Sequence, residues 1–161
     1  GERTPHKDPY ARGGWIGLTA RHRREHLIRA VMEGATFAMN DSLELIRGLG
    51  VKVGEVRVLG GGARSEFWRQ MQADIYHNAV HTINAEEGPA FGAALLAGVG
   101  AGVWKSVPAA CKTAIETVSK TEMDLKTAGV YRKLYDDIYR PLYKALKPTF
   151  DEMAHFARTS E

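Results

Sequence analysis

The sequence predicts an α/β domain in which helices are layered on a sheet. Between residues 20 and 100, segments whose apolar residues recur at helical spacing alternate with short runs rich in β-branched residues. Glycine-rich turns separate these runs, as in folds whose helices cover a sheet. The chain has 161 residues, of which 44% are hydrophobic. This is enough to bury a real core, so we expect residues 1–161 to form one domain.

The N-terminal segment predicts a loop followed by a long helix. Residues 1–13 are expected to be an extended loop that leads into the domain, because their two prolines disfavour helix in the preceding residues. The Gly-Trp-Ile-Gly-Leu run at 14–18 resembles a short strand. Thr19 is a suitable N-cap for an amphipathic helix of roughly 25 residues. Gly48 and Gly50 are expected to end that helix.

Two strand–helix units follow in the middle of the chain. Residues 56–59 predict a strand, and about 65–76 predict a helix. A second strand is expected at 80–83 and a third helix at 89–98. Small side chains dominate this last helix, so it can approach a sheet closely. In particular, Ala93 and Ala94 are expected to pack beneath the preceding glycine turn.

The C-terminal third has a weaker pattern. Residues 100–128 contain only one expected element, a short helix near 109–118. From residue 130 onward, apolar and aromatic side chains repeat at helical spacing. Pro141 and Pro148 are expected to kink or interrupt that helix.

Composition excludes several classes of partner. The net charge of +3 is too small to indicate nucleic-acid binding, and the basic run at 21–24 is interpreted as a solvated helix start. No apolar run approaches the roughly 20 residues of a membrane span, and no signal-peptide pattern occurs. Cys111 is the single cysteine, so no internal disulfide can form and a cytoplasmic location is expected. Because Gly1 stands first instead of Met, the chain is expected to be part of a longer one.

The glycine run at 60–62 is the strongest local signal for chemistry. It joins the expected strand to a helix start, where free N–H groups and the helix dipole favour a phosphate or ribose hydroxyl. A tight turn without a ligand is the alternative. A dinucleotide-binding pattern fits poorly, because Ser65 stands where the third glycine belongs.

Other residues with reactive side chains give weaker signals. Glu86 and Glu87 could serve acid–base chemistry, or could simply complement the dipole of the following helix. His77 and His81 are four residues apart but fall across an expected strand, so no metal site is predicted.

Four blocks of the sequence, in order, resemble the FGGY carbohydrate kinases. Residues 13–18 and 26–34 resemble the second signature of the family. The opening Gly-Glu-Arg-Thr-Pro-His at 1–6 resembles its xylulokinase branch in particular. The stretch at 60–71 is similar to the adenosine motif of that branch, and 88–94 is similar to its next helix.

This resemblance implies the ribonuclease H-like fold of actin-like ATPases, with the chain as the C-terminal lobe of a two-lobe sugar kinase. It also implies phosphorylation of a ketopentose such as D-xylulose, with ATP and Mg²⁺ as cofactors. The catalytic aspartate, the first phosphate loop, most of the sugar pocket and the Mg²⁺ ligands would belong to an N-terminal lobe that precedes Gly1. No residue of this chain is therefore expected to be catalytic, and the chain alone is expected to be inactive.

The resemblance also suggests which residues hold the nucleotide. Gly61, Gly62 and Ala63 would present their backbone to the α-phosphate and ribose. Ser65 and Glu66, at the helix start, would contact the ribose or adenine.

Three function classes follow from the sequence. The chain is the ATP-binding part of a sugar kinase, a nucleotide-binding module without catalysis, or a structural domain that has kept only the fold. ATP, a small sugar and its own N-terminal lobe are the expected partners, and a homodimer is compatible with the sequence. Nucleic acid and membranes are not expected partners.

Overall fold

A computed structural model describes residues 1–86 and 88–159. These residues form two compact units. Unit 1 joins Gly1–Lys52 to the C-terminal residues from Leu125 onward, and unit 2 is Val53–Asp124.

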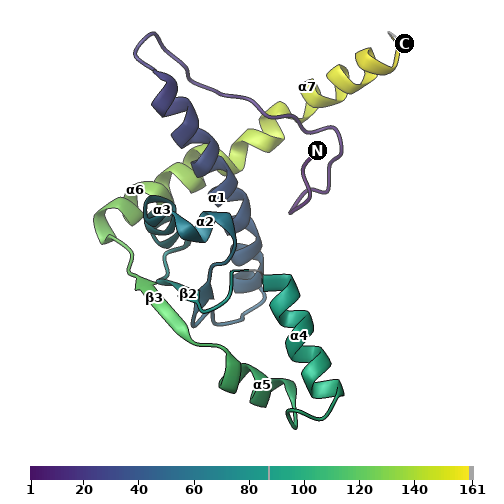
Figure 1. Ribbon diagram of the computed structural model, residues 1–161. Coiled ribbons are helices and arrows are strands. Elements are labelled where there is room, and N and C mark those ends of the chain that lie inside the picture. The colour runs from purple at the N-terminus through teal and green to yellow at the C-terminus, as the bar shows by residue number, and fades with distance from the viewer. Residues whose placement is uncertain (87, 160–161) are drawn as a thin grey trace. The chain divides into compact units, whose positions relative to one another are not determined.

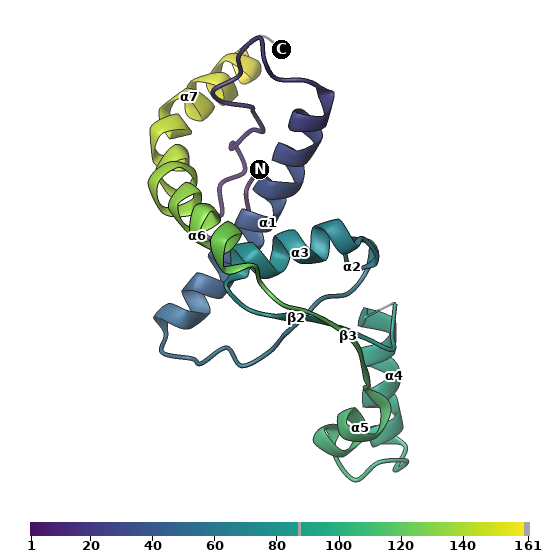
Figure 2. The ribbon, with the colours of Figure 1, turned by 90° about the vertical axis from the view of Figure 1, so that its left-hand side faces the viewer.

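Unit 1 is built from helices. Helix α1 spans Arg24–Gly48, and α6 spans Leu125–Leu134. A π-helical turn, η1, at Tyr135–Tyr139 leads directly into α7, Arg140–Thr159. The segment from α6 to α7 is therefore helical throughout, which Figures 1 and 2 show as one continuous green-to-yellow ribbon. Before α1, the backbone of residues 1–23 contains no helix, and Glu2 pairs with Asp8 in an isolated antiparallel bridge.

The core of unit 1 is an aromatic cluster around Phe37 of α1. The rings of Tyr131, Tyr135 and Tyr139 lie 5.1–6.0 Å from the Phe37 ring. Asp41 accepts hydrogen bonds from the hydroxyls of Tyr135 at 2.6 Å and Tyr139 at 3.3 Å. Burial raises the pKa of the Asp41 carboxyl and of both tyrosine hydroxyls. The contacts between the aromatic rings and these hydrogen bonds hold α1 against η1.

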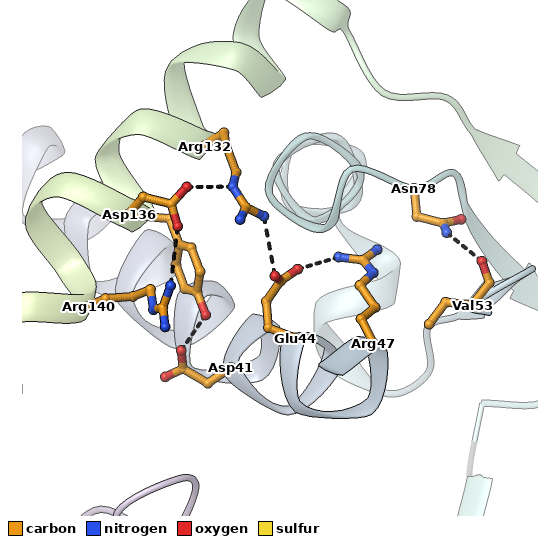
Figure 3. Close-up of polar contacts among 9 residues, drawn as sticks. Asp41, Glu44, Arg47, Val53, Asn78, Arg132, Asp136 and Arg140 are labelled. Atoms are coloured by element: carbon orange, nitrogen blue, oxygen red, sulfur yellow. Dashed lines mark hydrogen bonds and ion pairs between the residues drawn. The ribbon is translucent and has the colours of Figure 1, made fainter. Parts of the chain in front are cut away.

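A polar chain beside this cluster joins the same elements (Figure 3). Glu44 accepts hydrogen bonds from Arg47 at 2.6 Å and from Arg132 of α6 at 3.3 Å. Arg132 also donates through Nε to Asp136 at 2.6 Å. Both carboxylates of this polar chain, Glu44 and Asp136, thus have a guanidinium partner.

The start of α1 differs from the expectation. Thr19 is not its N-cap, because the Thr19 N–H donates to Nδ1 of His22 at 2.9 Å and holds residues 19–22 in a separate turn. Arg23 caps the helix instead, and its N–H donates to Nδ1 of His26 at 3.0 Å. Residues 14–18 form no strand either, since they pair with no other strand in the described chain.

The expected interruptions by proline are only partly present. Pro148 lies inside α7 and does not end it. Pro141 is the second residue of α7 and follows η1, where the Arg140 N–H donates to the Tyr135 carbonyl five residues earlier. The wider π turn gives room to a proline ring that would clash with a carbonyl in a regular α-helix.

Unit 2 contains a three-stranded sheet among the described residues, in the order β1-β2-β3. Strand β1, Val56–Arg57, is parallel to β2, Val80–Ile83. Strand β3, Thr117–Thr121, is antiparallel to β2, and Figure 2 shows the two side by side. The Val58 N–H continues the β1–β2 pairing by donating to the His81 carbonyl at 2.9 Å.

Four helices accompany this sheet in the described part of unit 2. They are α2 at Gly61–Arg64, α3 at Glu66–Tyr76, α4 at Gly88–Gly100 and α5 at Val107–Ala114. The expected strands 56–59 and 80–83 and helices 65–76 and 89–98 are confirmed, within about two residues at each end.

Strand β3 is the main element that the sequence did not predict. The helix expected at 109–118 ends at Ala114, and the chain then becomes extended. The run Thr-Val-Ser-Lys-Thr at 117–121 is rich in β-branched residues, but its strand form depends on pairing with β2.

The core of unit 2 lies under α3. Asp74 of this helix is buried, and its Oδ1 accepts from the Asp124 N–H at 2.7 Å and from Gln70 at 2.9 Å. Burial raises the pKa of the Tyr76 hydroxyl to about 12. At the end of α3, Asn78 donates to the Val53 carbonyl at 3.3 Å (Figure 3). The buried apolar residues of the unit are Val58, Met71, Ala73, Ile75, Tyr76, Val80, Leu95 and Ala110.

The small residues of α4 that pack closely against the rest of the protein are not the expected ones. Ala93 and Ala94 are exposed in the structure, so the expectation that they pack beneath the glycine turn is wrong. A helix places only part of its surface against any one neighbour, and in α4 the buried side chain is Leu95. The close approaches are at Gly88, beside Leu59, and at Gly98, beside Trp104.

Gly98→Ala is expected to destabilise the protein by about 1–3 kcal/mol, the usual cost of overpacking. A Cβ at Gly98 would lie 2.3 Å from Cζ3 of the Trp104 ring, so the ring would have to move. Gly92→Ala in the same helix is the matched control, because a Cβ there meets nothing within 4 Å. It should stabilise α4 by roughly 0.5–1 kcal/mol. Thermal melting of both variants is the measurement. Equal shifts in their melting temperatures would contradict this account.

Candidate functional site

The candidate site lies where two parallel strands end. Strands β1 and β2 are neighbours and run in the same direction, so Gly60 and Ala85 follow them at one edge of the sheet. Ligands of α/β sheets bind outside this carboxyl edge. Gly60 has φ +75°, a conformation that side chains disfavour, and it turns the chain from β1 into α2. The glycine run therefore stands at the edge where a ligand is expected.

The next two glycines have different surroundings. A Cβ at Gly61 would meet nothing within 4 Å, so the backbone there is open. A Cβ at Gly62 would lie 3.2 Å from Cε3 of Trp68, so close packing within the protein already favours glycine at this position. The Ala63 N–H donates to the Gly60 carbonyl at 3.1 Å and closes the turn. Gly61 is thus the glycine of this pair that protein packing does not explain.

Ser65 and Glu66 begin α3, as their pattern predicts. The Ser65 hydroxyl accepts from the Trp68 N–H at 3.3 Å and caps the helix. Its O–H remains able to donate to a ligand, because the cap uses only an acceptor position. Glu66 is exposed in the first turn, where its charge complements the helix dipole.

Arg69 fixes the conformation of the turn. Its Nη1 donates to the Ala63 carbonyl at 2.6 Å, a charge-assisted bond from α3 back to α2. Arg64 pairs with Glu86 at 2.5 Å, but these side chains are 68% and 76% exposed, so the pair adds little stability. Glu87, the other carboxylate considered for chemistry, lies outside the described residues.

A cavity of about 300 Å³ opens beside the turn. Its lining residues come from the end of β1, the glycine turn, α3, the end of β2 and the start of β3. Of the five expected nucleotide contacts, Ala63 lines it, whereas Gly61, Gly62, Ser65 and Glu66 do not. The lining residues that sequence reasoning missed include Arg69, Thr82 and Ser119.

No three His, Cys, Asp or Glu side chains of the described residues lie close enough together to hold a metal ion. No described helix is long and apolar enough to cross a membrane. Unit 1 also carries cavities of about 590 and 700 Å³, but no residue expected to bind the nucleotide lines either.

Comparison with known proteins gives consistent matches. The sequence profile of the FGGY family of carbohydrate kinases, C-terminal domain, matches residues 1–101. The xylulose kinase of Bacillus subtilis is 40% identical over 147 residues, which are 91% of this chain and 29% of that protein.

Solved structures agree with the sequence comparison. The xylulose kinase of Rhodospirillum rubrum superimposes with a TM-score of 0.76 at 31% identity, covering 89% of this chain and 29% of that one. The gluconate kinase of Lactobacillus acidophilus gives a TM-score of 0.81 at 28% identity, covering 95% and 31%. The expected fold class, the C-terminal lobe of an actin-like ATPase, is therefore confirmed. The chain spans less than a third of the length of these relatives.

Proposed function

Because the chain belongs to the FGGY family of carbohydrate kinases, we propose that it is the nucleotide-binding C-terminal part of an ATP-dependent xylulose kinase. Several relatives bear the name xylulose kinase, including proteins that are 37–45% identical over at least 66% of this chain. Their greater length supports an N-terminal lobe that completes the enzyme.

The open backbone at Gly61 is the observation that carries this proposal. It stands at the carboxyl edge of two parallel strands, next to a cavity and just ahead of the first turn of α3. A phosphate or ribose can approach backbone N–H groups only where no side chain intervenes. Phosphoryl transfer needs mainly positioning and charge neutralisation, and a rigid turn of this kind supplies positioning.

The other parts of the reaction are assigned to the preceding lobe. Mg²⁺ supplies charge neutralisation on the phosphates when it is bound. Its ligands are proposed to lie mainly in the N-terminal lobe, as membership of the family implies. The same holds for the catalytic base and most of the sugar pocket. A cytoplasmic location is also proposed, because a kinase of this kind needs a supply of ATP.

A nucleotide-binding module without catalysis is the second candidate. The feature that favours it is the site itself, which offers a nucleotide an open turn and a cavity. The two candidates differ in what the longer protein does with D-xylulose.

The test compares the complete protein with the isolated 161-residue chain. The complete protein should release ADP from ATP in proportion to D-xylulose 5-phosphate formed, at a rate of roughly 1 per second or faster. The isolated chain should show no turnover. Binding of ATP by the complete protein without sugar phosphorylation would favour the second candidate, and turnover by the isolated chain would overturn the division of labour between the lobes.

A further inference from the structure

Strand β3 brings a pair of hydroxyl groups to the same edge as the glycine turn. Since β3 is antiparallel to β2, its first residues lie beside the last residues of β2. Ser119 is opposite Thr82, and Thr117 is opposite Ile83. Thr82, Ser119 and Ala63 all line the 300 Å³ cavity.

The two hydroxyls are directly bonded to each other. Thr82 Oγ1 and Ser119 Oγ are 2.6 Å apart, and in the described structure neither hydroxyl has another hydrogen-bond partner. The pair has two protons, and the bond between the oxygens uses one of them. The second O–H can donate to a ligand, and oxygen lone pairs remain to accept. The pair is therefore a preformed donor and acceptor on one wall.

The rest of the cavity lining is part apolar and part charged, and the charges come from Arg64, Arg69 and Glu86. Leu59, Ile83 and Val118 supply apolar surface around the hydroxyl pair. A volume of about 300 Å³ is at the lower end of small-molecule sites. This volume suits a nucleoside but is too small to enclose a whole nucleoside triphosphate.

We propose that the Thr82–Ser119 hydroxyl pair recognises the nucleoside of ATP. The inference rests on the proposed function and extends that site to a strand beyond residues 1–101, which match the family profile. With the phosphates at the open Gly61 backbone, the nucleoside occupies the adjoining cavity. Its hydrogen-bonding group is either a base edge or a ribose hydroxyl, and these share the same donor and acceptor chemistry.

The test measures ATP affinity of the complete protein by calorimetry for wild type, Ser119→Ala and Thr82→Val. Each substitution should weaken ATP binding roughly 3- to 10-fold, the effect of one neutral hydrogen bond. The KM for D-xylulose should stay unchanged. Thr117→Val is the matched control, because Thr117 is exposed on the same strand and does not line the cavity.

Two analogues identify the group that is recognised. If Ser119→Ala weakens ATP but not 2′-deoxy-ATP, the pair binds the ribose; if it weakens both but leaves GTP unchanged, the pair binds the base. Unchanged ATP affinity in a folded Ser119→Ala protein overturns this inference while leaving the kinase proposal intact. Equal losses in Ser119→Ala and Thr117→Val would mean that the pair only supports the sheet. A wild-type protein that binds no ATP would overturn both proposals.

Discussion

Gly61→Val is expected to weaken ATP binding by the complete protein at least tenfold while leaving its melting temperature nearly unchanged. A valine side chain at this position meets no protein atom within 4 Å of its Cβ, so the folded protein has room for it. The added methyl groups would occupy the space through which a phosphate reaches the backbone N–H groups. A tenfold loss corresponds to about 1.4 kcal/mol, a modest penalty for a displaced phosphate. Calorimetric titration with ATP, beside a melting curve, measures both quantities.

The neighbouring glycines are the controls for this experiment. Gly62→Ala places a Cβ 3.2 Å from the Trp68 ring, so this variant should lose stability as well as affinity. Gly60→Ala forces a side chain into a positive-φ conformation and should also be destabilised. Only Gly61 separates ligand binding from folding. Wild-type ATP affinity in a folded Gly61→Val protein would show that the glycine turn does not hold the nucleotide.

The sequence was most informative where local chemistry decides structure. The glycine turn after the strand 56–59 and the start of a helix near Ser65 both depend on residues close together in the chain, and both were predicted. The start of α1 was not, because a Thr19–His22 turn competes with a Thr19 cap, and residue type alone does not rank the two. The N–H of the true cap, Arg23, is satisfied by a histidine, which lies outside the usual capping pattern.

Contacts across the sheet could not be predicted in this way. Ser119 reaches the site only because β3 pairs with β2 in one particular register. A shift of one residue would turn its side chain to the opposite face of the sheet. Likewise, Gly98 appears in the sequence as one more small residue, and only the placement of Trp104 shows why a larger side chain is excluded. Such contacts depend on tertiary packing, which overrides local preference.

Arg69→Met should weaken ATP binding roughly tenfold or more, even though Arg69 is proposed to position the turn without acting in catalysis. The bond from Nη1 to the Ala63 carbonyl ties α3 to the turn, and bonds to charged groups are worth about 1.5–3 kcal/mol. Methionine keeps most of the side-chain stem but has no donor. The Nε of Arg69 is buried without a partner in the described structure, so losing it offsets part of the cost to stability. ATP affinity should therefore fall more than the melting temperature suggests.

Arg69→Lys and Arg64→Met complete this comparison. Lysine can donate one bond to the Ala63 carbonyl but lacks the planar fork, so it should restore ATP affinity only in part. Arg64→Met should change little, because the Arg64–Glu86 pair is largely exposed. The KM for D-xylulose should stay constant in all three variants, since Arg69 acts through the nucleotide turn. A fall in melting temperature with normal ATP affinity in Arg69→Met, or a rise in the KM for D-xylulose equal to that for ATP, would assign Arg69 to general packing and remove it from the site.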